Sequence, residues 1–160
     1  MKEVVIIVGA GPAGLATAAC LNVLSITNVV LKGEDCCAHL WKKKAYNCLK
    51  LHLAKEFFAL PHMPHSTSAP TYIPRDGFVQ YLDKYVAKFN VNPICNTLVE
   101  SAAYNEGSET WSVRTRNVAT GEEVERMARF LVVATGENTQ GLIPDVPDLK
   151  SFDGDVVHSS

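Results

Sequence analysis

The chain has 160 residues, of which 47% are hydrophobic and 20% charged, with a formal net charge of −2 at pH 7. This size and composition are typical of one globular domain, and the charge gives no electrostatic reason to expect a nucleic acid or an acidic membrane as partner. No apolar run approaches the ~18 residues of a membrane span. Lys2 and Glu3 precede the short apolar run 4–8, which argues against a signal peptide.

The N-terminal residues predict a strand, a helix and a second strand. Residues 3–8 form a short β-branched run without alternation, which is typical of a buried parallel strand. Residues 12–24 predict a helix whose first turn accommodates Pro12, because the missing N–H costs nothing there. Residues 28–31 predict the second strand of a βαβ unit. The apolar face of the helix is predicted from helical spacing to consist of Ala16, Ala19, Cys20 and Val23.

The middle of the chain predicts a long irregular segment and then a helix. Between residues 32 and 74 the regular patterns fade, apart from a helical turn near residues 54–59. Residues 75–89 predict an amphipathic helix. Its apolar stripe is assigned to the core and consists of Phe78, Leu82, Tyr85, Val86 and Phe89.

The last elements predict an antiparallel meander followed by one more strand. Three strands near residues 97–104, 110–116 and 122–128 are separated by the turn sequences N-E-G and A-T-G-E. Residues 130–134 predict a further strand of the buried type. The predicted fold class is therefore α/β, with a parallel sheet and a three-stranded antiparallel meander.

The turn after the first strand carries the most informative motif. Gly9, Gly11 and Gly14 form G-x-G-x-x-G between a predicted strand and a predicted helix, the context of a Rossmann-like dinucleotide-binding sheet. Gly9 permits the tight turn, Gly11 lets the backbone approach a pyrophosphate, and Gly14 lets helix and strand pack closely. The alternative is a glycine-rich turn without a ligand. The amides at the start of the helix are predicted to bind the pyrophosphate. The predicted cofactor-binding turn consists of Gly9, Ala10, Gly11, Pro12, Ala13 and Gly14.

Lys32 stands where the motif calls for an acidic residue. An Asp or Glu ~20 residues after the turn normally accepts hydrogen bonds from a ribose, whereas lysine only donates. Lys32 either pairs with a 2′-phosphate, which would favour NADP, or is a solvated surface lysine. In the second case, which we prefer, Glu34 or Asp35 reaches back through Gly33 to the ribose.

Segments along the whole chain resemble the N-terminal part of plant flavin-containing monooxygenases of the YUCCA family. The specific ones are the central L-W-K-K-K-A-Y-N-C-L-K-L-H-L-A-K-E-F-F-A-L-P-H-M-P-H and the F-x-G-x-x-x-H formed by Phe152, Gly154 and His158. The segments G-A-G-P-A-G-L-A-T-A-A-C-L, F-V-Q-Y-L-D-K-Y-V-A-K-F and F-L-V-V-A-T-G-E-N agree with them, in the same order.

The resemblance implies an FAD-binding half in which residues 9–14 lie under the pyrophosphate. A second flavin-domain signature, which passes close to the FAD, is matched by Ala134, Thr135 and Gly136. A segment near the flavin is matched by Leu40 and Trp41, although Trp41 alone could equally anchor a loop. Lys32 completes the predicted cofactor-binding residues. No catalytic acid, base or nucleophile is named, because the cofactor carries the chemistry.

The family's activity is the oxidative decarboxylation of indole-3-pyruvate to indole-3-acetic acid (auxin) with FAD, NADPH and O₂. Residues 1–150 are expected to form an FAD-binding domain without its C-terminal return, and residues 151–160 to begin a linker to an NADPH-binding domain that this chain lacks. The chain is thus expected to be a fragment or a truncated paralogue. The alternative is a non-catalytic dinucleotide-binding or interaction module, for instance one that pairs with a full-length relative.

The cysteines and histidines receive structural assignments. The five cysteines include no C-x-x-C pair, so reduced thiols in a cytoplasmic protein are expected, and a flavin disulfide reductase is rejected. His62 and His65 are assigned to a loop, and no metal site is predicted. His52 is expected to be partly buried and structural, with a position facing flavin or substrate as the alternative, and His158 to be structural.

Overall fold

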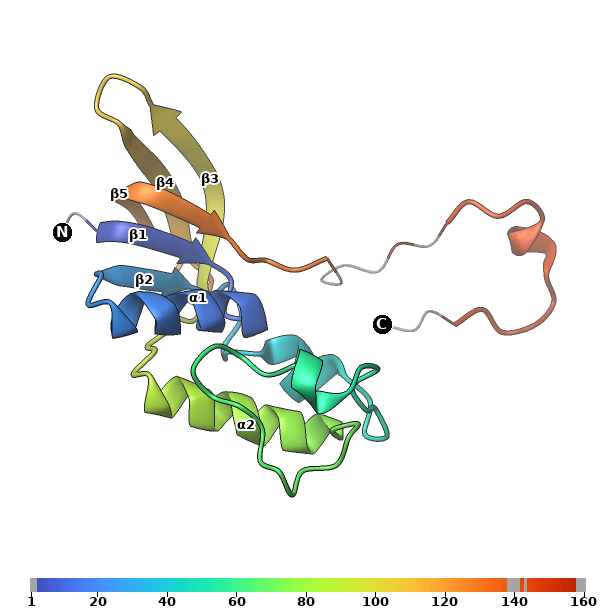
Figure 1. The fold of residues 1–160 in the computed structure, drawn as a ribbon. Helices are drawn as coiled ribbons and strands as arrows, with labels where there is room; N and C mark the ends of the chain where they lie inside the picture. The colour runs from blue at the N-terminus through green and yellow to red at the C-terminus, as the bar shows by residue number, and fades with distance from the viewer. Residues whose placement is uncertain (1–2, 138–141, 143, 158–160) are drawn as a thin grey trace.

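A five-stranded sheet with the order β2-β1-β5-β4-β3 forms the framework of the computed structural model, which describes residues 3–137, 142 and 144–157 (Figure 1). β1 (Glu3–Val8) lies parallel to β2 (Asn28–Leu31) on one side and to β5 (Glu123–Val133) on the other. β4 (Thr110–Asn117) pairs antiparallel with β3 (Thr97–Asn105) and with β5. The predicted α/β class, with a parallel sheet and an attached meander, is confirmed.

β5 is one strand where the sequence predicted two. Its ladder changes partner at Ala128, which is aligned with Trp111 of β4 and with Glu3 of β1. No glycine or proline interrupts residues 123–133, so the strand continues from one ladder into the other. The expectation of a buried segment at 130–134 is wrong for Phe130 and Val133, which are 52% and 69% exposed. Within the described part of the chain, β1 is their only ladder partner.

Helix α1 (Pro12–Val23) packs on the sheet through a different face from the predicted one. The predicted Val23 is 53% exposed, whereas Ala19 is buried as expected. Nearly every residue of this helix is apolar, so spacing alone did not select a face, and the close approach of Gly14 to the end of β1 determines it. The buried residues are Gly14, Leu15, Ala18 and Ala19.

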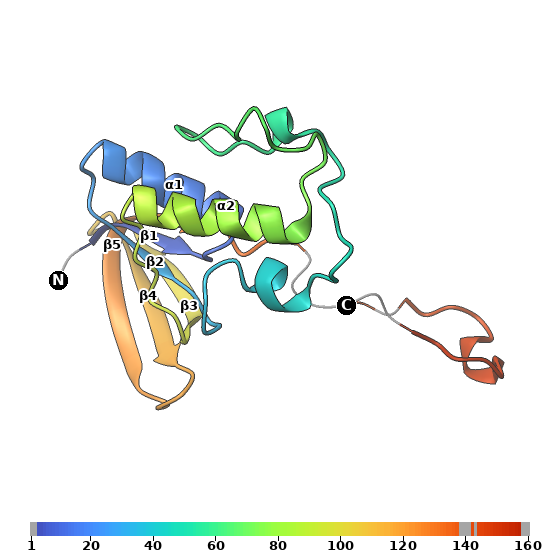
Figure 2. The ribbon, with the colours of Figure 1, turned by 90° about the horizontal axis from the view of Figure 1, so that it is seen from below.

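Helix α2 (Arg75–Lys88) lies on the same side of the sheet as α1 (Figure 2). Its stripe is core as predicted, with Phe78, Leu82 and Tyr85 at most 1% exposed. These side chains share one apolar cluster with α1 and with Val5 and Ile7 of β1. A second cluster on the opposite face of the sheet consists of Ile6, Val29, Leu31, Val113 and Ala128.

The segment between β2 and α2 is tied to α2 by tyrosine hydroxyls. The Tyr81 hydroxyl accepts a 2.7 Å hydrogen bond from the Leu60 amide and donates a 2.6 Å bond to the Met63 carbonyl. The Tyr85 hydroxyl donates to the Pro61 carbonyl at 3.0 Å, and burial raises the pKa of Tyr85 to about 12. The segment holds a π-helix, η1 (Leu40–Lys44), and the predicted helical turn, η2 (Lys55–Phe57).

After β5 the chain runs away from the sheet and includes a short 3₁₀ turn, η3 (Leu149–Ser151) (Figure 1). A Cβ on Gly154 would lie 2.6 Å from the Phe152 ring, but this ring is 62% exposed and can move aside, so the contact does not explain the F-x-G spacing. His158 lies outside the described residues.

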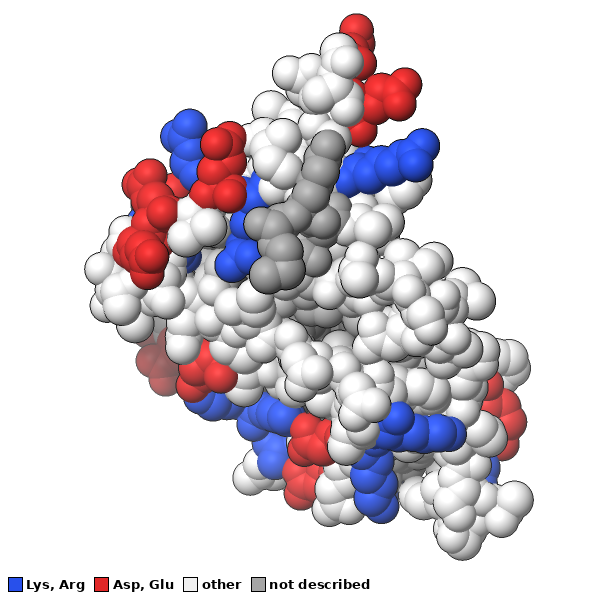
Figure 3. Space-filling model, turned by 90° about the vertical axis from the view of Figure 1, so that its left-hand side faces the viewer, with Lys and Arg blue, Asp and Glu red and all other residues white. Residues whose placement is uncertain are grey.

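Among the described helices, none has the length and apolar character needed to cross a membrane. Acidic and basic side chains are interspersed on the face shown in Figure 3.

Candidate dinucleotide-binding site

The carboxyl ends of the three parallel strands bring the predicted segments together at one edge of the sheet. Parallel strands all end at the same edge, where open α/β sheets bind their ligands. The Gly9 amide donates to the Leu31 carbonyl of β2, and the Ala134 amide donates to the Val8 carbonyl of β1, both at 2.8 Å. The predicted turn, the segment after β2 and the Ala134 signature are therefore neighbours.

Gly9 and Gly14 have the conformations that the motif predicts. Gly9 has a φ of +109°, and a Cβ built on it would lie 2.2 Å from the Ala134 carbonyl oxygen. A Cβ on Gly14 would lie 2.0 Å from the Gly9 carbonyl oxygen. Backbone atoms cannot move aside as a flexible side chain can, so the predicted tight turn and the close contact of helix and strand are confirmed.

Gly11 faces open space instead. A Cβ built there would meet nothing within 4 Å, and its φ of −81° and ψ of −177° suit any residue. The fold therefore does not require glycine at this position, in contrast to Gly9 and Gly14. A ligand that approaches the backbone at Gly11 does require it.

The amides at the start of α1 point to an anion as that ligand. The first N–H groups of a helix have no partner inside the helix. No backbone hydrogen bond joins the amides of Gly11, Ala13 or Gly14 to another described element, and no side chain caps them. Pro12 has no N–H, and no acidic residue lies in the first turn. These amides and the helix dipole form a site of the kind that binds phosphate.

Lys32 is not the solvated surface lysine that the sequence favoured. Its side chain is only 17% exposed, and its Nζ lies 2.5 Å from the Glu34 carboxylate. Burial opposes ionisation of Glu34, but the hydrogen bond and charge of Lys32 outweigh it and hold the pKa of Glu34 below its ordinary value. The carboxylate of Glu34 is thus charged and lies next to the side chain of Lys32. This is the arrangement expected if Glu34 takes the place of the acidic residue that the motif has at position 32.

Asp35 is engaged elsewhere. Its carboxylate pairs with Lys43 and lies 3.4 Å from His39 Nδ1. The hydrogen bond from Lys43 is the main reason that the pKa of Asp35 falls to about 2. Of the two acidic residues considered, only Glu34 pairs with Lys32.

The remaining predicted residues lie in different environments. The Trp41 ring packs edge-on against Phe78 of α2, with centroids 4.8 Å apart, so it anchors η1 to the helix. Leu40 is 38% exposed, and Gly136 has a φ of +79° beside open space. His52, expected to be partly buried, is exposed and lies edge-on against Phe58.

Ala38 is a positioning residue that the sequence analysis missed. It has a φ of +52°, and its amide donates a 2.8 Å hydrogen bond to the Ala10 carbonyl, which ties the segment after β2 to the glycine turn. An alanine carries no sequence signal for a left-handed conformation, so no pattern could have revealed it.

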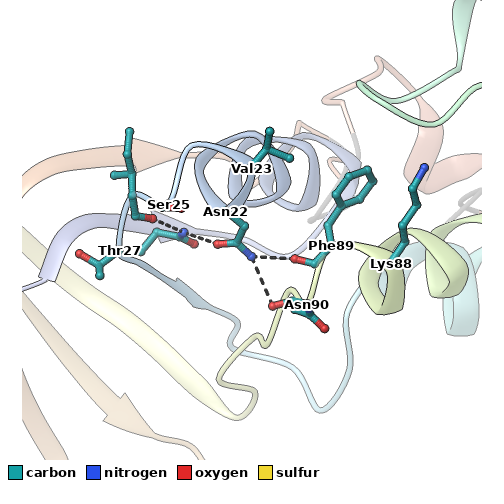
Figure 4. Close-up of a pocket in the computed structure, with 9 residues that line it drawn as sticks. Asn22, Val23, Ser25, Thr27, Lys88, Phe89 and Asn90 are labelled. Atoms are coloured by element: carbon teal, nitrogen blue, oxygen red, sulfur yellow. Dashed lines mark hydrogen bonds between the residues drawn. The ribbon is translucent and has the colours of Figure 1, made fainter.

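A surface pocket lies away from this edge, between the C-terminal ends of α1 and α2 (Figure 4). Asn22 fills a structural role there, because its Nδ2 donates to the Phe89 carbonyl at 2.9 Å and the Asn90 carbonyl at 3.3 Å. Asn28 Nδ2 donates to Asn22 Oδ1 at 2.8 Å. Asn22 and Asn28 therefore form hydrogen bonds at the C-terminal end of α2 and are not part of the candidate dinucleotide site.

Residues 6–159 match the family described as pyridine nucleotide-disulphide oxidoreductase. The chain belongs to this family. The chain is 54% identical over 160 residues to the probable indole-3-pyruvate monooxygenase YUCCA10 of Arabidopsis thaliana. The match covers 100% of this chain and 42% of that protein. The predicted resemblance to YUCCA-type monooxygenases is thereby confirmed.

Solved structures of other proteins share the fold. A flavin monooxygenase from Stenotrophomonas maltophilia superposes with a TM-score of 0.83 at 25% identity, over 99% of this chain and 45% of that chain. OTEMO in complex with FAD and NADP superposes with a TM-score of 0.75 at 23% identity, over 97% of this chain and 29% of that chain. The chain thus spans less than half of the length of each protein compared here.

Proposed function

We propose that this chain forms the FAD-binding part of an NADPH- and O₂-dependent monooxygenase that converts indole-3-pyruvate to indole-3-acetate. In that reaction indole-3-pyruvate, O₂, NADPH and a proton give indole-3-acetate, CO₂, water and NADP⁺. The open backbone at Gly11, beside amides without a cap, carries the proposal. The 54% identity to a probable indole-3-pyruvate monooxygenase supports the substrate.

The residues present fit the adenine dinucleotide part of FAD. The amides of Gly11, Ala13 and Gly14 would hold the pyrophosphate, and the Glu34 carboxylate would accept hydrogen bonds from the ribose. Lys32 keeps Glu34 ionised and oriented. Ala134, Thr135, Gly136, Leu40 and Trp41 would border the cofactor. Bound FAD would supply the redox chemistry between NADPH and O₂.

The proposal assigns residues 1–150 to the FAD-binding domain and residues 151–160 to the start of a linker towards an NADPH-binding domain. The sequence contains one G-x-G-x-x-G, which supports a nicotinamide site outside residues 1–150. The five cysteines are all free, which supports a reducing compartment such as the cytoplasm.

A chimeric enzyme tests the proposed activity. Residues 1–157 would replace the matching segment of the Arabidopsis relative. We expect the chimera to bind FAD and to oxidise NADPH in the presence of indole-3-pyruvate, with release of CO₂ and formation of indole-3-acetate. The matched control is the same chimera with Gly11→Val, which should lose flavin and turnover together. A chimera that binds FAD but oxidises no NADPH with indole-3-pyruvate would refute the activity and leave the cofactor site standing.

Glu34→Gln tests the ribose contact. We expect the dissociation constant for FAD to rise about tenfold, because a hydrogen bond to a charged acceptor is roughly 1.4 kcal/mol stronger than one to a neutral acceptor. Titration of the flavin-free protein with FAD, followed by flavin fluorescence, measures it.

The control for this substitution is the neighbouring Asp35→Asn. Asp35 is already held by Lys43 and His39, so its substitution should change FAD affinity less than about twofold, within the noise of most surface substitutions. The reverse ranking of the two variants would make Asp35 the ribose acceptor.

A further inference from the structure

Three potential metal ligands of different types meet just after β2, outside the contacts proposed for FAD. Ligand atoms of Asp35, Cys36 and His39 all lie within 4.8 Å of one another, and this is the only such group of three among the described residues. We propose that this Asp35–Cys36–His39 cluster is a binding site for a divalent transition metal ion of the Zn²⁺ type. A thiolate, an imidazole and a carboxylate together suit zinc better than Mg²⁺ or Ca²⁺.

The spacing of the ligand atoms is close to what a tetrahedral ion demands. Bond lengths of about 2.3 Å to sulfur and about 2.05 Å to nitrogen and oxygen place sulfur and nitrogen about 3.6 Å apart, and nitrogen and oxygen about 3.4 Å apart. In the structure, Cys36 Sγ lies 3.8 Å from His39 Nδ1. His39 Nδ1 lies 3.4 Å from Asp35 Oδ1. These two distances thus lie within a few tenths of an ångström of those in a tetrahedral site, and the third pair of ligand atoms lies within 4.8 Å.

The backbone on both sides of the cluster is fixed. The Asn96 amide donates to the Glu34 carbonyl at 2.9 Å, just before the cluster. The Ala38 amide donates to the Ala10 carbonyl at 2.8 Å, just before His39. A preformed backbone lowers the entropy that three ligands lose on binding an ion.

The charges around the cluster leave one carboxylate oxygen for the ion. Lys43 contacts Asp35 Oδ2, whereas His39 faces Oδ1. A metal at Oδ1 would thus leave the Lys43 contact in place, as an outer partner that orients the ligand. The carboxylate side chain is 53% exposed and the His39 side chain 19%, so the ion has a path from solvent. A water molecule would occupy the fourth position.

Cobalt titration of the chain tests the site. Under reducing conditions, Co²⁺ is expected to bind one equivalent with a thiolate-to-metal charge-transfer band, and Zn²⁺ to displace it. Cys36→Ser and His39→Asn should each weaken Zn²⁺ binding by more than about 100-fold, since loss of an outer-sphere partner alone costs 10- to 100-fold. Competition with a chelating dye gives the affinities, and circular dichroism confirms that each variant is folded.

Cys37→Ser is the matched control. The Cys37 thiol is adjacent in sequence, but its Sγ lies 3.7 Å from Lys42 Nζ and it is not a member of the cluster. Zn²⁺ affinity should change less than twofold. A second control, His62→Asn, removes the imidazole next to Cys20, at 3.8 Å. The proposal is overturned if Co²⁺ gives no thiolate band, if Cys36→Ser binds like the parent chain, or if either control weakens binding as much as Cys36→Ser.

Discussion

Gly11→Val is expected to weaken FAD binding by roughly 10²- to 10⁴-fold. The valine side chain would occupy the open space in which, on the proposed function, the pyrophosphate would meet the amides of Gly11 and Ala13. Hydrogen bonds to a charged group contribute ~1.5–3 kcal/mol each, and the loss of two corresponds to roughly that factor. Titration of flavin-free protein, by calorimetry or flavin fluorescence, measures the change.

The fold should tolerate Gly11→Val, so a loss of FAD affinity in this variant can be distinguished from a loss of folding stability. Valine can adopt the extended backbone of Gly11, and nothing lies within 4 Å of its Cβ. Loss of glycine at the start of the helix costs about 1 kcal/mol, or roughly 2–4 °C in Tm. An unchanged FAD affinity in the valine variant would mean that the pyrophosphate lies elsewhere.

The sequence predicted correctly those helices and strands whose residue pattern is compatible with only one type of element. β1, β2, α2, β3 and β4 have the predicted bounds within about two residues, because β-branched runs, turn residues and an amphipathic stripe each allowed one assignment. The face of α1 was mispredicted because small apolar residues surround the whole helix. The break in β5 was mispredicted because a change of ladder partner leaves no mark in the sequence.

The candidate site likewise contains some features that the sequence predicted and others that it did not. The roles of Gly9 and Gly14 follow from the motif, because steric rules for a strand-to-helix turn are local. Lys32, which pairs with Glu34, is held by the distant Ile94, whose carbonyl accepts a hydrogen bond from the Lys32 amide. Contacts of this kind come from residues more than sixty positions away, so no local pattern could distinguish a solvated lysine from a paired one.

Gly14→Ala is expected to reduce the free energy of unfolding by about 3 kcal/mol or more, at the upper end of the cost of overpacking. Alanine is the better helix former by about 1 kcal/mol, so helix propensity alone predicts the opposite sign. The decisive contact is the Gly9 carbonyl oxygen, 2.0 Å from the Cβ that the substitution adds. Because the backbone fixes the position of the Cβ and the Gly9 oxygen is itself a backbone atom, α1 must move away from β1, and the turn that carries the amides moves with it.

Gly77→Ala is the matched control, since Gly77 also lies in the first turn of a helix, α2. Its added Cβ would meet a methyl group of Ile73 at 3.3 Å, which can shift, so we expect a change within about 1 kcal/mol. Urea denaturation with a constant m-value measures both variants, and a loss of 3 kcal/mol should lower Tm by roughly 6–12 °C. A Gly14→Ala chain as stable as the parent would contradict the close packing of α1 on β1, and with it the position of the helix start on which the proposed phosphate site depends.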